Sequence, residues 1–226
     1  MCNEFRNEVE SDPVSVAVIL NPLAALHAMI GEFDRARELT REGSRILSDV
    51  GRMQSAVDHH EALVHTLAGE PAVAAELLRT GYERLEHMGE KSLLSTTAAM
   101  LAQAVYAQGL YGEADLYCGV SEATAAHDDL LSQTIWRGVR SKLLARQGEF
   151  QEAEGLAAEA VDLIARTDLL SHHGEALLDL AEVLRLADRQ AKADEAAHAA
   201  LELYQRKGNV VGAGLARSLV AAPAST

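Results

Sequence analysis

One short turn motif recurs through this chain of 226 residues at an almost constant spacing. Its clearest copy begins at Gly148 and reads Gly-Glu-Phe-Gln-Glu-Ala, with the aromatic residue and the alanine three positions apart. Glycine adopts the left-handed backbone that ends a helix, and residues three apart share one face of the next helix. Copies that recur every 38 to 40 residues predict stacked helical hairpins, one per copy. The five copies are Gly31–Ala36, Gly69–Ala74, Gly109–Ala114, Gly148–Ala153 and Asp188–Ala193.

Small residues occupy fixed positions around each turn, which supports the same division into units. A small residue precedes each turn position by seven residues, alanine follows it by five, and another small residue follows it by twelve. Small side chains at these places allow neighbouring helices to approach closely. The residues before the turns are Ala24, Ala62, Ala102, Ser141 and Ala181, and those twelve after them are Gly43, Gly81, Ser121, Ala160 and Ala200.

The expected fold is all-α, an open right-handed superhelix of about five helical hairpins that ends in a capping helix over Val210–Val220. The first leading helix looks short, because Pro22 suits a first helical position with Asn21 as its cap. No linker rich in glycine, serine or proline divides the chain. We therefore expect one helical-repeat domain over residues 14–220, a loosely ordered N-terminus over 1–13 and a frayed tail over 221–226. The leading helices are expected at about Pro22–Ile30, Met53–Ala68, Lys91–Gln108, Asp129–Gln147 and Ser171–Ala187, and their trailing partners end at about Ser48, His87, His127, Arg166 and Gln205.

Composition and charge exclude several classes of partner. Hydrophobic residues make up 48% of the chain and aromatic residues 4%, which favours closely packed helices over a β-sheet. The net charge of −14 disfavours a surface for nucleic acid or for an anionic membrane. No apolar run approaches the ~18 residues of a membrane span, and the acidic N-terminus lacks the features of a signal peptide. A cytoplasmic location is the simplest expectation.

The sequence contains no recognisable catalytic or metal-binding motif. The run His59-His60-Glu-Ala-Leu-Val-His65 resembles a zinc-binding helix, but five residues from His60 to His65 place the two side chains about 140° apart around a helix. The two cysteines, Cys2 and Cys118, have no metal or redox spacing. A phosphate-binding Gly-x-x-x-x-Gly-Lys loop is also missing from the sequence. We therefore expect a protein that is not an enzyme and that uses no cofactor and no metal.

One aromatic and basic cluster admits two interpretations. Trp136 and Arg140 lie four apart, and Arg137 and Arg140 lie three apart, so the three side chains share a region of one helix. They form either a patch that grips an acidic or aromatic peptide, or a tryptophan that fills the seam between two units beneath arginine stems.

The repeated pattern of Gly-x-aromatic-x-x-Ala with its flanking small residues resembles the tetratricopeptide repeat. It differs in having a period near 39 residues rather than about 34, so its helices are longer. Tetratricopeptide arrays bind their partners along the concave face of the leading helices, at positions ten, six, three and two residues before the turn. The resemblance therefore implies a groove formed by Asn21, His59, Gln103, Tyr106, Lys142, Arg146, Glu182 and Arg185.

The second half of the chain has a further resemblance. The segments Ser132–Ala153, Glu175–Ala187 and Leu203–Asn209 look like the C-terminal repeat region of bacterial class III adenylate or guanylate cyclases fused to an AAA-type ATPase. The resemblance is strongest over Ala98–Ala216. In that family the repeats are regarded as a sensing or docking arm, so no catalysis is implied here.

These observations predict a non-catalytic helical-repeat scaffold for protein–protein interaction, with a regulatory role in bacterial signalling. Lys142, Arg146 and Arg185 favour a protein or peptide partner that is acidic, because a groove that keeps three cations is unusual in an acidic chain. Two alternatives stay open: an effector-sensing arm that binds a small ligand, and a truncated fragment of a larger signalling ATPase or cyclase. Self-association is also expected if the first repeat leaves apolar surface uncovered.

Overall fold

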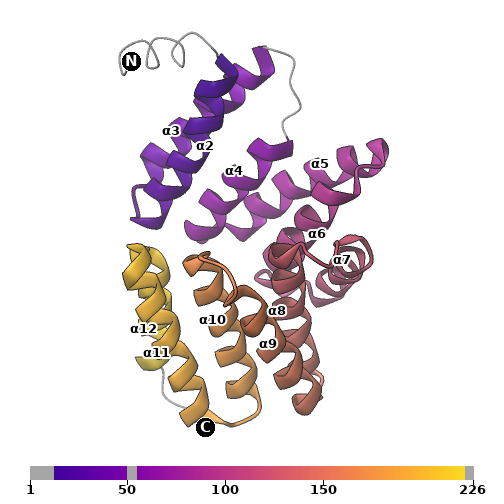
Figure 1. Cartoon of the computed structure of the whole chain (residues 1–226), viewed down its shortest axis with the longest axis vertical. Coiled ribbons are helices and arrows are strands. Elements are labelled where there is room, and N and C mark those ends of the chain that lie inside the picture. Colours follow the sequence, from indigo (N-terminus) through magenta and orange to yellow (C-terminus); the bar gives the residue numbers. More distant parts are fainter. Residues whose placement is uncertain (1–12, 50–54, 222–226) are drawn as a thin grey trace.

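The computed structural model describes residues 13–49 and 55–221, and every element in these ranges is an α-helix (Figure 1). The expectations for residues 1–12 and 222–226 concern residues outside these ranges. Pro13 is the first residue of the first helix, and Ala221 is the last residue of the last helix. Five hairpins and a C-terminal helix follow one another along the chain, which confirms the predicted all-α repeat fold. The helices are α2 (Pro13–Met29), α3 (Phe33–Asp49), α4 (Ser55–Leu67), α5 (Pro71–Met88), α6 (Lys91–Tyr106), α7 (Tyr111–Thr124), α8 (Leu130–Arg146), α9 (Phe150–Ile164), α10 (Leu170–Leu186), α11 (Gln190–Lys207) and α12 (Val210–Ala221).

The predicted turn positions have the left-handed backbone that the repeat requires. All five lie between a leading and a trailing helix, and each has a positive φ angle. An aspartate is tolerated in the fifth turn because Asp visits the left-handed region more readily than other residues with a Cβ. The φ angles are 87° for Gly31, 74° for Gly69, 77° for Gly109, 89° for Gly148 and 58° for Asp188.

The small residues of the repeat form the contacts between helices. The residue seven positions before each turn and the alanine five positions after it are fully buried in all five units. Close packing at these places explains why the chain keeps small side chains there. The buried residues are Ala24, Ala62, Ala102, Ser141 and Ala181 in the leading helices, and Ala36, Ala74, Ala114, Ala153 and Ala193 in the trailing helices.

The first hairpin is complete, so the expectation of a short first helix is wrong. Helix α2 begins at Pro13, and Pro22 lies inside it. A proline inside a helix removes the hydrogen bond to the carbonyl four residues earlier, at a cost of about 3 kcal/mol. That carbonyl belongs to Val18, which is exposed to solvent. The apolar run before Pro22 packs through Val14 and Ala17 against α3, and this burial extends the helix past the proline.

An apolar stripe on this first hairpin faces solvent. Ile19, Leu23, Leu26 and Ile30 are 52%, 37%, 49% and 47% exposed. Their spacing of four, three and four residues is that of the a and d positions of a coiled coil. Leu23, Leu26 and Ile30 also line a pocket with Lys207 and Gly208, so part of the stripe faces the C-terminal end of α11. Self-association through the first repeat stays a prediction.

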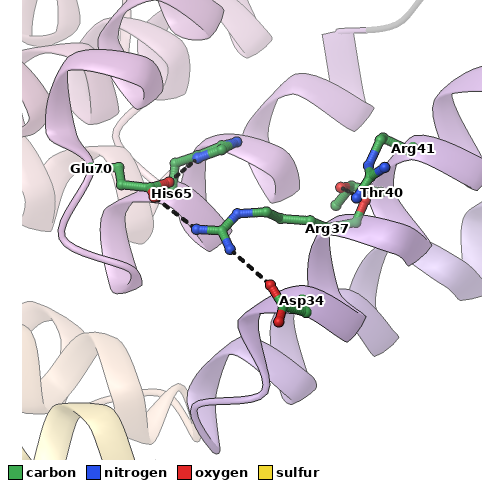
Figure 2. Close-up of polar contacts among 6 residues, drawn as sticks. All are labelled: Asp34, Arg37, Thr40, Arg41, His65 and Glu70. Carbon is green, nitrogen blue, oxygen red and sulfur yellow. Dashed lines mark hydrogen bonds and ion pairs between the residues drawn. The ribbon is translucent and has the colours of Figure 1, made fainter.

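Charged contacts join α3 to the turn between α4 and α5 (Figure 2). Glu70 accepts a hydrogen bond of 2.8 Å from Arg37 and lies 2.6 Å from Nδ1 of His65. Hydrogen bonds from His65 and Arg37 hold the pKa of Glu70 below its usual value. His27 and Glu32 repeat the same pairing in the first turn, also at 2.6 Å. His27 and His65 each lie four residues before a turn position, and both make this contact with a glutamate across the turn.

The aromatic and basic cluster lies between units. Trp136 is buried at 5% exposure and packs with Ile135 and its neighbours, while its indole Nε1 donates to Gln133. The guanidinium of Arg137 lies 4.3 Å from the indole ring, and Arg140 pairs with a carboxylate of α7. Of the two interpretations, the structure shows the tryptophan that fills a seam beneath an arginine stem.

The hairpins curve so strongly that the two ends of the array meet. Helix α12 contacts α2, and Figure 1 places α11 and α12 next to the first hairpin. The leading helices α4, α6, α8 and α10 thus surround a common interior with α12. None of the helices in the described part of the chain is both long and apolar enough to cross a membrane.

Candidate binding cavity

A cavity of about 380 Å³ lies on the inner side of the curved array. Helices α4, α6, α8 and α10 contribute most of its wall, and α5, α11 and α12 complete it. Its volume falls within the range of about 300–1,000 Å³ that is typical of ligand sites. The apolar part of the wall consists of Leu63, Leu67, Leu78, Met100, Leu131, Ile135, Leu178 and Leu215.

Two of the predicted groove residues, His59 and Gln103, line this cavity. Nε2 of His59 lies 2.7 Å from the hydroxyl of Thr97, which ties α4 to α6. Burial, together with the neighbouring His60, lowers the pKa of His59 to about 4. His59 is therefore neutral near pH 7 and offers the cavity a hydrogen-bonding group rather than a cation.

Helix α10 adds a histidine–carboxylate pair to the wall. Nδ1 of His172 lies 3.0 Å from Oε2 of Glu175. Burial alone would lower the pKa of His172, but the charge and hydrogen bond of Glu175 outweigh it and raise the pKa. The ring of Tyr204 closes this part of the cavity, and it fits because Gly174 and Gly212 leave room on either side. A Cβ at either glycine would come within 2.7 Å of the ring.

Lys142, a third predicted groove residue, is buried at 6% exposure instead of facing a ligand. Its ammonium lies 2.6 Å from Oδ1 of Asp179 and 4.4 Å from the centroid of the Tyr106 ring. Burial alone would lower the pKa of Lys142, but Asp179 and Glu182 raise it overall, so the side chain stays charged. The carboxylate reaches Lys142 because position 138 is Gly138, where a Cβ would overlap the Asp179 side chain.

Three further predicted residues form one polar cluster across α6, α8 and α10. The hydroxyl of Tyr106 donates to Oε1 of Glu182 at 2.5 Å. Arg146 donates from Nε to the Tyr106 oxygen at 2.7 Å and from Nη2 to Glu182 at 2.9 Å. The repeat thus brings together residues that lie 36 to 76 positions apart. They hydrogen-bond to one another, and the cation of Arg146 is already paired.

The remaining two predicted residues, Asn21 and Arg185, lie away from the cavity. Asn21 is 5% exposed and packs against Gly43 of α3, and its Oδ1 has no hydrogen-bond partner among the described residues. Arg185 donates to the carbonyl of Leu219 in α12 and lies 3.5 Å from Asp194. The capping helix therefore covers the position that the sequence assigned to the last part of the groove.

Several cavity residues were absent from the sequence-based set, and the long repeat explains why. Thr96, Ile135 and Glu175 each lie thirteen residues before a turn position, and Met100 and Asp179 lie nine before one. The tetratricopeptide register of ten, six, three and two residues includes neither position. Because the period near 39 lengthens the hairpins, extending the register by one helical turn would have found the position at thirteen, while the position at nine lies one residue from the register's own position at ten.

The described residues offer no obvious reactive group. No set of three or more His, Cys, Asp or Glu side chains among them is placed to hold a metal ion. Burial raises the pKa of Cys118 to about 12, so its thiol stays protonated near pH 7. The arrangement of apolar walls and a few polar groups is suited to holding a ligand.

The sequence matches no protein-family model and no curated protein. Solved structures nevertheless share the fold. The putative kinesin light chain of Podospora anserina, described by its nearly identical TPR-like repeats, aligns with a TM-score of 0.57 and 19% identity, over 88% of this chain and 99% of that one. The fold of the present chain is accordingly a TPR-like solenoid.

Two further similar structures contain a bound peptide or factor. NprR in complex with its cognate peptide NprX aligns with a TM-score of 0.67 and 12% identity, over 96% of this chain and 64% of that one. A Rap protein complexed with Competence and Sporulation Factor aligns with a TM-score of 0.60 and 15% identity, over 95% of this chain and 66% of that one. The present chain thus spans slightly less than two thirds of either protein.

Proposed function

We propose that this chain is a non-catalytic interaction scaffold that binds a short peptide segment of a partner in its inner cavity. The observation that carries the proposal is the cavity of about 380 Å³. Residues of four successive leading helices and of α12 line it. Apolar walls supply binding energy through burial, and the few polar groups fix the orientation of a ligand. NprR with NprX and Rap with Competence and Sporulation Factor support the proposal, because each is a similar fold with a bound peptide or factor.

The likeness to a cyclase-associated repeat arm extends the proposal to a regulatory role in bacterial signalling. Residues 14–220 act as one domain in this proposal, since the curve of the whole array forms the cavity. The sequence favoured an acidic partner because of Lys142, Arg146 and Arg185. Each of these cations is paired with a carboxylate, so the proposal does not assign them to the partner.

Selection from a displayed library of random heptapeptides tests the proposal. Gln103→Trp places an indole in the cavity, and Glu122→Trp places the same side chain on the exposed surface of α7 as a matched control. Peptides enriched on the wild-type protein should bind the control variant equally and lose at least about tenfold in affinity on Gln103→Trp. Equal binding to both variants would refute binding in the cavity, once circular dichroism has shown that both are folded.

A second candidate function is the sensing of a small ligand. It is favoured by the convergence of side chains from seven helices on one cavity. A compound that binds the folded state alone raises the melting temperature. In a thermal-shift screen, a ligand of this cavity should stabilise the wild-type protein and the Glu122→Trp control but not Gln103→Trp.

A further inference from the structure

Two carboxylates stand in the wall of the cavity. Glu175 and Asp179 line it, and none of the described residues that line it is a lysine or an arginine. Asp179 already faces the ammonium of Lys142 at 2.6 Å. Glu175 is therefore the carboxylate that is placed to meet a charged ligand.

Glu175 has room for a second partner. His172 contacts its Oε2 atom at 3.0 Å, and no described residue donates a hydrogen bond to its Oε1 atom. The Glu175 side chain is 28% exposed, so it is neither sealed in the core nor fully solvated. A carboxylate in such a partly dehydrated place interacts more strongly with a cation than it would in bulk water.

The surroundings of Glu175 are apolar. Leu178 follows it by one turn on the same face of α10, and both line the cavity with Met100 and Ile135. These side chains can bury the apolar neighbours of a cationic residue. The net charge of −14 adds a long-range attraction for a basic ligand and repels an acidic one.

We propose that the cavity selects a peptide segment in which a lysine or arginine side chain lies among apolar residues, with the cation bound by Glu175. This inference rests on the proposed function and adds the chemistry of the partner. The proposed partner is basic, whereas the sequence favoured an acidic one. The reason is that the folded chain pairs its own groove cations and leaves an oxygen of Glu175 open.

The test is the composition of heptapeptides selected on three proteins: the wild type, Glu175→Gln and the matched surface variant Glu122→Gln. The pKa of His172 is raised by Glu175, and a protonated His172 would compensate that carboxylate, so the selection is run at about pH 9, where histidine is less protonated and lysine and arginine stay charged. We expect peptides from the wild type and from Glu122→Gln to be enriched in lysine or arginine flanked by apolar residues. A representative peptide should lose about tenfold in affinity on Glu175→Gln, and its variant with norleucine in place of the basic residue should bind Glu175→Gln and wild type equally.

The outcomes separate this inference from the proposed function. Peptides that are apolar without charge preference, or that are enriched in Asp or Glu, would overturn the cation preference, while a loss of their binding on Gln103→Trp would leave the peptide site standing. Equal affinity of a basic peptide for wild type and Glu175→Gln would overturn the role of Glu175. No enrichment on the wild type would overturn both proposals.

Discussion

Replacing Gly138 by alanine should destabilise the protein, although alanine is the better helix former. In an open position of a helix, this change stabilises by up to about 1 kcal/mol. Gly138 lies inside α8, where a new Cβ would overlap the carboxylate of Asp179 and lie 3.2 Å from its Cγ atom. The carboxylate must rotate away, and it then leaves the buried ammonium of Lys142, which it now meets at 2.6 Å.

The size of the effect follows from that ion pair. Breaking a buried pair and leaving one charge without its partner costs about 3–5 kcal/mol. Glu182 stands near enough to raise the pKa of Lys142 and would compensate part of this loss. After the gain in helix propensity is subtracted, the free energy of unfolding should fall by about 2 kcal/mol.

Urea denaturation followed by circular dichroism measures this change, and Gly155→Ala is its matched control. Gly155 lies inside α9, where a new Cβ would meet no neighbouring side chain within 4 Å, so its replacement should stabilise the protein by up to about 1 kcal/mol. Equal stabilisation by both substitutions would show that Gly138 is not needed to keep Asp179 paired with Lys142. The effect of Gly138→Ala should also shrink in an Asp179→Asn background, because the ion pair is then already lost.

Three further predictions concern stability and assembly. The pKa of His59 is lowered to about 4 in the folded chain, so the unfolded chain takes up the proton first as the pH falls. The free energy of unfolding should therefore fall between about pH 6.5 and about pH 4. At about pH 5, urea titrations should show that the wild type has lost about 2 kcal/mol more of its free energy of unfolding than His59→Gln, and parallel profiles would contradict this. Asp188→Gly should raise the melting temperature because glycine removes the strain of a φ of 58°, and an unchanged or lower value would argue against strain there. Leu26→Lys should reduce concentration-dependent association in sedimentation velocity, because Leu26 is 49% exposed in the apolar stripe of α2; an identical profile would show that the stripe is not the contact.

The sequence predicted the architecture because the architecture depends on local rules. Turn positions such as Gly148 need a left-handed backbone, and positions such as Ala102 need a small side chain, so both recur at the period of the repeat. The start of the first helix could not be predicted from Pro22. Local preference favoured a helix start there, and tertiary packing of Ala17 against α3 decided otherwise.

The candidate site was harder to predict, because it depends on the curvature of the whole array. The repeat register assigned Tyr106, Arg146 and Glu182 to groove positions of successive leading helices, and the structure brings the three side chains within hydrogen-bond distance of one another. It could not tell that these groups bond to one another, because the carboxylates that neutralise Arg146 and Lys142 come from the neighbouring unit. The register also missed that α12 contacts the first hairpin and contributes to the wall of the cavity, because no local sequence pattern encodes a contact between the two ends of the array.

Amide hydrogen exchange with and without a selected heptapeptide is the sharpest test of peptide binding in the cavity, because it locates the peptide on the folded protein. Helices α4, α6, α8, α10 and α12 share the wall of the cavity. We predict slower exchange in these five helices when the peptide binds, and little change in α3 and α9. Protection confined to α3, α7 and α9 or to the exposed stripe of α2 would contradict binding in the cavity.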